Sequence, residues 1–338
     1  MPKRILLILV AAAVVMIFAQ GTITNSASIS SGLLVVANQK EHTVLIVDPD
    51  KRAELAKIVV GVNGHEVIVS KDGLFAYVPI YGNSGVGRPG TDGSTIDVVD
   101  LEKRKLSATI DLGKPLRPHR AEFGPDGLLY VTAELANAVD VLDPATRKVI
   151  AEIPTGQEQS HMLVISPDGR RGYTANVGAG SVSVLDLVNR SLVTTIPVAK
   201  MVQRISMTPD GLQVFTHDQG AARIAVIETA TNKITGWIGL PAPAYASEPT
   251  PDGRELLALS PSGKLFVIDL ASRNVRESFD IPASNGEILI SPDAKFAFAS
   301  CPQAGIIEIL DLGANKLESP ITLTPGVDGL AWMSPAQK

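Results

Sequence analysis

The sequence of 338 residues predicts an all-β fold: a seven-bladed β-propeller of four-stranded antiparallel sheets, closed by pairing of its N- and C-terminal strands. Three observations indicate this fold: a turn motif that recurs at a nearly constant interval, strand-like segments between the turns, and complementary part-sheets at the two chain ends. A period of about 42 residues is typical of propellers with one sheet per repeat. The motif is Ser/Thr-Pro-Asp-Gly or a close variant, and its aspartates are Asp72, Asp126, Asp168, Asp210, Asp252 and Asp293.

The repeat over 160–201 shows the expected strands most clearly. An apolar segment that starts at His161 ends in Ser166-Pro167-Asp168-Gly169. In this turn proline fixes φ, aspartate caps the backbone, and glycine takes the left-handed position. Three further segments rich in β-branched residues follow, each bounded by turn residues: 172–176, 181–186 and 192–198. Each repeat therefore predicts one four-stranded sheet.

The two chain ends predict how the ring closes. The first strands of six sheets are expected to begin near His65, His119, His161, Gln203, Tyr245 and Gly286. A seventh first strand, 329–335, has no second strand after it, whereas 33–37 and 43–48 have the pattern of second and third strands with no first strand before them. The C-terminal strand is therefore expected to complete the N-terminal sheet, which leaves no open edge.

The N-terminal residues predict export. Lys3 and Arg4 precede an apolar run over 5–18 and then small or polar residues, which is the pattern of a secretory signal peptide. The run is shorter than the roughly 18–20 residues that a membrane-spanning helix needs. We therefore expect a signal peptide within 1–27, a propeller domain over 32–335, a periplasmic or secreted location, and no membrane-spanning segment after cleavage.

Composition and motifs exclude several function classes. The net charge is −5 and no basic run lies outside the signal region, so nucleic acid is not an expected partner. The single cysteine allows no intramolecular disulfide, so stability must come from packing. The chain also lacks the Gly-x-Ser-x-Gly, His-Glu-x-x-His and Cys-x-x-Cys-His motifs and a Rossmann fingerprint. None of these motifs therefore assigns an enzyme class.

The predicted second strands resemble a known repeat. Three of them follow a Pro-Asp-Gly or Lys-Asp-Gly turn and are variants of the tetrapeptide that names the YVTN-type propeller repeats: Tyr173-Thr174-Ala175-Asn176, Tyr130-Val131-Thr132 and Tyr77-Val78-Pro79. The resemblance covers roughly 32–335. It implies an exported seven-bladed propeller, from a family with many members of unassigned activity that is related to cytochrome d1-type, lactonase-like and lyase-like propellers. Function must still be argued from the site, because one fold hosts many functions.

One position of the repeat predicts a ligand-binding face. Seven residues before the turn aspartate, consecutive sheets carry His65, His119, His161, Gln203 and Tyr245. In an up-and-down sheet, the start of the first strand and the turn after the second strand emerge on the same face, which we call the top face. His42 and His217 are predicted in such turns. All five histidines of the chain are therefore expected on the top face.

We expect the residues at this position to bind a small-molecule or protein ligand. Arg120 and Arg204, one residue further along their repeats, and Arg88 are expected to contribute. Arg88 lies in a connection, 81–93, that is about 12 residues longer than its equivalents. Long connections in compact folds are usually functional or disordered. The segment thus predicts a lid or partner-contacting loop, with a flexible insertion as the alternative.

The histidine row has two further interpretations. His65, His119 and His161 would suit a divalent metal ion, because imidazole is a common ligand and three protein ligands leave a coordination position for water. Alternatively, histidine at this position only caps the start of each strand. The cofactor therefore stays open at this point, with a divalent metal ion as one candidate.

Three residues are candidates for catalysis: Glu122, Glu248 and His217. The two glutamates share a mid-strand position that is apolar in other sheets, and a carboxylate there is costly unless it is paired or in contact with water. They would flank the channel and act on a ligand or cation. Alternatively, they form structural salt bridges with Arg120 or Arg204.

Three functions fit these observations. The first is an exported propeller that binds a small molecule, a cofactor or a protein partner at a histidine-lined top face. The second is a metal-dependent lactonase, hydrolase or lyase at the same site, in which the ion polarises an oxygen and histidine or glutamate acts as general base. The third is a structural or surface-layer propeller without catalysis. The histidine row and the long connection favour the first over the third, and the sequence does not separate the first from the second.

Overall fold

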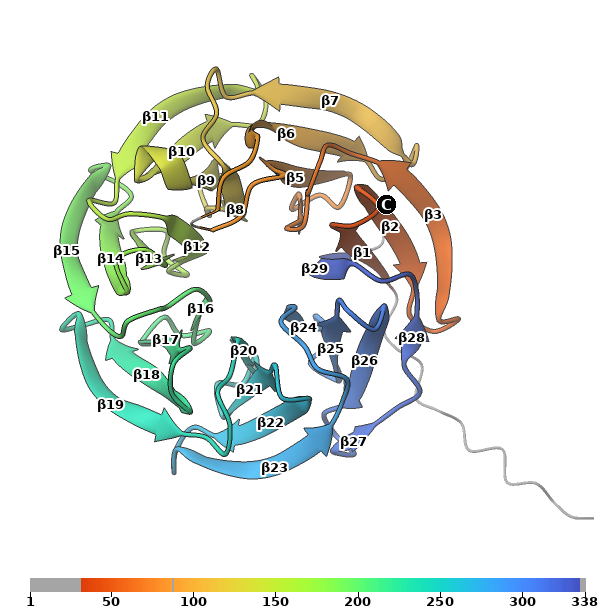
Figure 1. Cartoon of the computed structure of the whole chain (residues 1–338), viewed down its shortest axis with the longest axis vertical. Coiled ribbons are helices and arrows are strands. Elements are labelled where there is room, and N and C mark those ends of the chain that lie inside the picture. Colours follow the sequence, from red (N-terminus) through yellow and green to blue (C-terminus); the bar gives the residue numbers. More distant parts are fainter. Residues whose placement is uncertain (1–31, 87, 335–338) are drawn as a thin grey trace, which may run out of the picture.

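The described residues, 32–86 and 88–334 of a computed structural model, form a ring of seven antiparallel sheets (Figure 1). We number the sheets one to seven from the N-terminus. In each sheet one strand lies next to the central axis and the last strand lies at the rim of the ring. The predicted all-β, seven-bladed propeller is therefore confirmed.

The first four sheets, with strands given from the axis outward, are as follows. Sheet one contains β29 (Val327–Met333), β1 (Leu33–Asn38), β2 (Thr43–Asp48) and β3 (Ala53–Val59). Sheet two contains β4 (Ile68–Val69), β5 (Phe75–Gly82), β6 (Asp92–Asp100) and β7 (Lys105–Asp111). Sheet three contains β8 (Pro118–Phe123), β9 (Leu129–Ala133), β10 (Ala138–Asp143) and β11 (Lys148–Pro154), with the short 3-10 helix η1 (Glu134–Ala136) between β9 and β10. Sheet four contains β12 (Ser160–Ile165), β13 (Arg171–Asn176), β14 (Ser181–Asp186) and β15 (Ser191–Pro197).

The last three sheets follow the same plan. Sheet five contains β16 (Ile205–Met207), β17 (Gln213–Asp218), β18 (Arg223–Glu228) and β19 (Lys233–Gly239). Sheet six contains β20 (Ala246–Pro249), β21 (Glu255–Ser260), β22 (Lys264–Asp269) and β23 (Asn274–Asp280). Sheet seven contains β24 (Ile288–Ile290), β25 (Phe296–Cys301) and β26 (Ile306–Asp311), and its outer strand is split into β27 (Lys316–Leu317) and β28 (Ile321–Thr322).

Pairing of β29 with β1 closes the ring, as the chain ends predict. The two strands run antiparallel, with Leu34 opposite Trp332 and Val36 opposite Leu330. In Figure 1 the blue C-terminal strand lies beside the red N-terminal strand of the same sheet. Sheet one is therefore assembled from both ends of the chain, and β1 is not left as an open edge.

The core lies between neighbouring sheets and follows the alternation of side chains along each strand. On β1, Val35 packs in a cluster shared with sheet two, whereas Leu34 and Val36 pack in a cluster shared with sheet seven. All three side chains are fully buried. Because both faces of the strand are covered, β1 has an unbroken apolar sequence rather than an alternating one.

The recurring aspartate turns form as predicted. In sheet four, the Ser166 hydroxyl donates to Asp168 at 2.6 Å, Asp168 accepts from the Arg170 amide at 3.0 Å, and Gly169 has φ of +70°. The hydroxyl oxygen of Ser166 also accepts from the Arg171 amide, at 2.9 Å. The turn thus satisfies its own backbone donors, which explains why the same residue types recur in each repeat.

Two predictions for the top-face connections were wrong, and β29 begins and ends two residues before the predicted strand 329–335. Strands β5 and β6 extend into the long connection and shorten it to 83–91. Gly93 allows this extension, because a Cβ at Gly93 would lie only 1.7 Å from the carbonyl oxygen of Ile80. His217 lies on β17 rather than in the turn after it, because β17 pairs with β18 as far as Asp218.

The described residues contain no helix long and apolar enough to cross a membrane. The predicted signal peptide, 1–27, lies outside the described residues.

The closing strand generates a testable prediction. Deletion of 327–338 removes β29, which exposes the edge of β1 and the apolar side chains of Leu34 and Val36. We expect loss of soluble protein and of cooperative thermal unfolding, measured by circular dichroism. The control is deletion of 335–338, which keeps β29. Equal unfolding midpoints for the two truncated proteins would contradict the closure.

Candidate functional site

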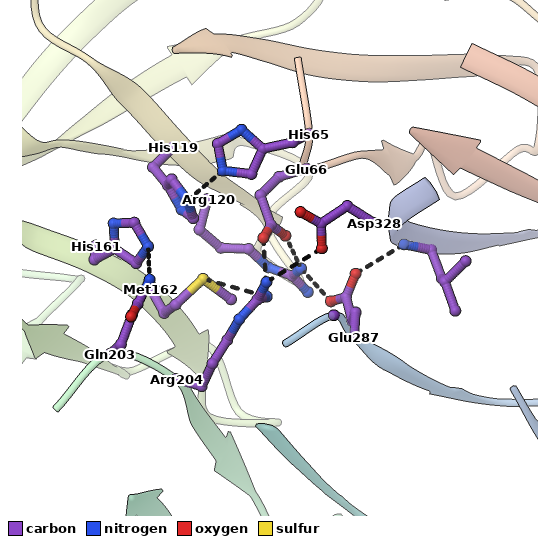
Figure 2. A network of polar contacts seen from close by, with 12 residues as sticks. His65, Glu66, His119, Arg120, His161, Met162, Gln203, Arg204, Glu287 and Asp328 are labelled. Atoms are coloured by element: carbon purple, nitrogen blue, oxygen red, sulfur yellow. Dashed lines mark hydrogen bonds and ion pairs between the residues drawn. The ribbon is translucent and has the colours of Figure 1, made fainter. Parts of the chain in front are cut away.

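The predicted row of five residues converges on one cavity at the top face. His119 and His161 lie on β8 and β12. The other three lie within three residues before the innermost strand of their sheet: His65 before β4, Gln203 before β16 and Tyr245 before β20. All five line a cavity of about 250 Å³, which we call the top pocket. Figure 2 shows His65 beside His119, and His161 beside Gln203. The position in the repeat thus predicted that these five residues lie together, and they form part of the lining of the cavity.

One chain of hydrogen bonds fixes the tautomers of two histidines. Nδ1 of His65 lies 3.0 Å from the carbonyl oxygen of Asn63, so it carries the hydrogen and donates. Nε2 of the neutral His65 ring then accepts from Nε2 of His119, at 2.9 Å. Nδ1 of His119 is left with a lone pair and has no partner among the described residues, although the side chain is only 1% exposed.

A second chain fixes His161. Its Nδ1 donates to the buried carboxylate of Glu134, and the other oxygen of Glu134 accepts from the Tyr81 hydroxyl at 2.8 Å. Nε2 of His161 accepts from the Gln203 amide at 3.0 Å, and the Gln203 carbonyl accepts from Gln219 at 3.2 Å. Every polar atom named in this chain has a partner, so His161 is held in one orientation.

Burial keeps two of the imidazoles neutral. It lowers the pKa of His65 and that of His119, and the neighbouring His161 and His65 rings lower the pKa of His119 further. The rings of His119 and His161 are nearly stacked, with centroids 3.5 Å apart. At neutral pH the unpaired nitrogen of His119 is therefore a hydrogen-bond acceptor or a metal ligand rather than a cation.

Next to the top pocket lies a layer of charged side chains, which we call the ionic layer and define as Glu66, Arg120, Arg204, Glu287 and Asp328. Arg204 and Asp328 of this layer line the pocket. Glu66 lies at the centre of the layer, 2.8 Å from Arg120 and 2.8 Å from Arg204 (Figure 2). Burial alone would raise the pKa of Glu66, but the charges of Arg204 and Arg120 outweigh it and hold the pKa below its usual range.

The two other acids of the ionic layer, Glu287 and Asp328, lie beside the same two arginines. Arg120 also pairs with Glu287 at 2.6 Å, and Glu287 accepts from the backbone amide of Leu330 at 2.8 Å. Arg204 lies 3.8 Å from Asp328. The layer therefore joins residues from sheets one, two, three, five and seven across the axis.

Below the ionic layer, the innermost strands enclose a second cavity of about 310 Å³ that contains both candidate glutamates. Glu122 pairs with Arg120 at 2.7 Å, which agrees with the salt-bridge interpretation. The Glu248 carboxyl has no hydrogen bond or ion pair to a described residue. Burial, and then the charge of Glu287, raise its pKa to about 8, so Glu248 holds a proton at neutral pH.

Arg120 lines the second cavity, together with Glu122 and Glu248, rather than the top pocket. The two other predicted site residues line neither cavity. Arg88 is exposed, and its backbone carbonyl accepts from Arg117 at 3.2 Å, which ties down the long connection. His217 is fully buried on β17, and neither ring nitrogen has a partner among the described residues. Burial and the charge of Arg204 lower the pKa of His217 to about 3.

The described residues offer one group with metal-ligand spacing, and it differs from the predicted triad. Ligand atoms of His65, Glu66 and His119 lie within 4.8 Å of one another. His161 is not in this group, and both of its nitrogens are already bonded to Glu134 and Gln203.

Sequence reasoning missed three residues of the site: Tyr81, Glu134 and Asp328. Tyr81 and Glu134 follow the apolar part of a second strand, at the top face, so their position in the repeat was an available signal. Asp328 directly precedes Gly329, which occupies the repeat position of His65 in sheet one. The residue before the repeat position therefore indicates Asp328, whereas Tyr81 and Glu134 are indicated by the ends of the second strands.

Comparison with known proteins supports the fold and assigns no family. No family model matches the chain, and no curated protein matches it. Among solved structures, it is similar to hydrazine synthase from Kuenenia stuttgartiensis, with 19% identity, a TM-score of 0.69, and coverage of 91% of this chain and 99% of that one. It is also similar to a protein of unknown function from Desulfotomaculum acetoxidans, with 16% identity, a TM-score of 0.75, and coverage of 90% and 100%. A third similar structure is the dihydro-heme d1 dehydrogenase NirN in complex with DHE, with 15% identity, a TM-score of 0.63, and coverage of 92% and 77%. These similarities show a shared seven-bladed propeller fold.

The ionic layer generates a testable prediction. Glu66→Gln removes the anion shared by two buried arginines, so we expect the free energy of unfolding to fall by about 3–5 kcal/mol. The matched change Glu122→Gln removes a half-buried partner of Arg120 only, and we expect a loss of about 1 kcal/mol or less. Urea unfolding of both variants measures the difference. Equal losses would show that Glu66 is not the centre of the layer.

Proposed function

We propose that the protein is an exported propeller that binds a small molecule or cofactor in the top pocket. The observation that carries this proposal is the unpaired Nδ1 of His119, a buried acceptor on a residue that lines the top pocket beside the oriented side chains of His161 and Gln203. Buried polar atoms are almost always paired, and an unpaired one costs free energy in the unliganded protein. A bound ligand that donates to His119 would remove this cost.

The organisation of the site supports binding over a purely structural role. His161 and Gln203 are fixed by Glu134, Tyr81 and Gln219, so a ligand would meet side chains that are already oriented. Preorganised polar groups reduce the entropic cost of binding. A strand-capping role would require only local contacts of each histidine with its own sheet, whereas His65 and His119 bond across two sheets.

Two further points support an exported, ligand-binding protein. The N-terminal residues have the pattern of a signal peptide, which favours a periplasmic or secreted location. NirN, which has a similar fold, was solved with DHE bound. Because identity with NirN is only 15%, this similarity suggests a cofactor as one class of ligand and does not identify it.

A second candidate function is metal-dependent hydrolysis or lyase chemistry at the same face. It is favoured by the spacing of His65, Glu66 and His119. The hydrogen bond from His65 to Asn63 puts the lone pair of His65 on Nε2, where an ion would take the place of the hydrogen bond from His119. The positive charges of Arg120 and Arg204, both 2.8 Å from Glu66, oppose a cation at this position. The metal-free binding function is therefore the better supported of the two.

Crystallographic fragment screening tests the proposed function with a range of small molecules, so the ligand need not be identified first. Crystals of the protein would be soaked with a library of small polar fragments. We expect bound fragments to concentrate in the top pocket, with a donor group facing His119, and to be lost from this pocket in His119→Ala. The control is Arg171→Lys, a change outside both cavities in a partly exposed side chain that pairs with Asp186.

Zinc titration of tag-free protein by calorimetry separates the two candidate functions. The metal-dependent function requires one tightly bound ion per chain, and binding should disappear in His65→Ala. The metal-free function is supported when fragments occupy the top pocket and zinc does not bind. Fragments that bind elsewhere on the surface but never in the top pocket would refute the proposed function.

A further inference from the structure

Arg204 is a buried cation with unused hydrogen-bond donors. Its side chain is 5% exposed, and Nε has no partner among the described residues. Nη1 is 2.8 Å from Glu66 without hydrogen-bond alignment, and 3.7 Å from the sulfur of Met162. Its guanidinium carbon lies 5.4 Å from the ring centroid of Tyr245. A buried guanidinium normally matches its planar donors with carboxylate or carbonyl oxygens, so Nε and Nη2 of Arg204 lack a close acceptor even though Nη1 is paired with Glu66.

Asp328 does not supply that acceptor. Its Oδ2 accepts from Gln39 at 3.1 Å, whereas Oδ1 is 3.8 Å from Nη2 of Arg204 and has no hydrogen bond. This distance exceeds a direct hydrogen bond and suits a bridging atom. Burial raises the pKa of Asp328 well above its usual range, so its carboxyl is a weak counter-charge. Glu66 is shared with Arg120, which leaves Arg204 able to bind a further anion.

In the same pocket, His119 needs a hydrogen-bond donor, whereas Arg204 needs an acceptor. Nδ1 of His119 is an acceptor that needs a donor, because its Nε2 hydrogen is already donated to His65. Arg204, Asp328 and His119 all line the top pocket of about 250 Å³. One small molecule can therefore meet both requirements.

We propose that the ligand of the top pocket is a small α-hydroxy or α-amino carboxylate. Its carboxylate accepts hydrogen bonds from Arg204, and its hydroxyl or amino group donates to Nδ1 of His119. This proposal rests on the proposed function and names the class of ligand for the same site. It makes Arg204 the residue that selects for an acid, and His119 the residue that selects for the neighbouring donor.

Titration calorimetry with matched probes tests this ligand class. The acids are glycolate, both enantiomers of lactate, and L-alanine. Lactamide lacks the carboxylate and propionate lacks the donor. We expect at least one acid to bind with one site per chain, and the matching lactamide or propionate to bind about tenfold more weakly or worse, because each loses one charged or buried hydrogen bond.

Variants at the two residues separate their roles. Arg204→Lys keeps the charge but loses the planar pair of donors, so we expect acid binding to weaken about tenfold. His119→Ala should weaken acid binding and leave propionate binding unchanged, whereas His119→Asn, which keeps an acceptor oxygen, should restore part of the affinity. The control is Arg171→Lys, with unchanged affinity. Circular dichroism checks that each variant folds. If Arg204→Lys does not fold, the comparison of His119→Ala with His119→Asn still tests the ligand class.

Three results would overturn the inference. They are equal affinity for lactate and lactamide, unchanged affinity in Arg204→Lys, and no binding by any acid of the panel. If fragments nevertheless occupy the top pocket, the ligand-binding function stands and only the ligand class is wrong. If neither acids nor fragments bind there, both proposals fail.

Discussion

The site depends on one physical constraint: Glu66 must neutralise two buried arginines on the axis of the ring. Arg120 comes from sheet three and Arg204 precedes the first strand of sheet five, while Glu66 precedes that of sheet two. Glu287 and Asp328 extend the contacts to sheets seven and one. Removing one member would leave a buried charge without its partner, which is costly. The ionic layer thus ties five sheets together at the position where a propeller has its channel.

The layer also divides the channel into two cavities with different chemistry. Above it, the top pocket is lined by His65, His119 and His161, and Nδ1 of His119 is unpaired. Below it, the second cavity contains Glu122 and the protonated Glu248. Arg204 borders both cavities. A ligand that enters from the top face therefore meets oriented acceptors and the guanidinium of Arg204 in the same pocket.

The fold could be predicted because its signals are local. Turn residues such as Asp168 and Gly169 satisfy their own backbone, and the unmatched strands at the two ends leave one way to close the ring. The row of histidines was also predictable, because residues at the same position of each repeat meet at the axis of the ring. The pair of Arg120 with Glu122 was predictable from their shared strand. The partner of Arg204 was not, because it depends on a contact between sheets that are not neighbours: Arg204 meets Glu66, rather than Glu122 or Glu248.

The central claim is that His119 presents a lone pair on Nδ1 inside the top pocket. Long-range proton–nitrogen NMR correlation of the imidazoles in the unliganded protein measures this directly. We expect neutral rings of His65 and His119 at neutral pH, with the hydrogen on Nδ1 of His65 and on Nε2 of His119. A protonated His119 ring, or a hydrogen on its Nδ1, would contradict the account.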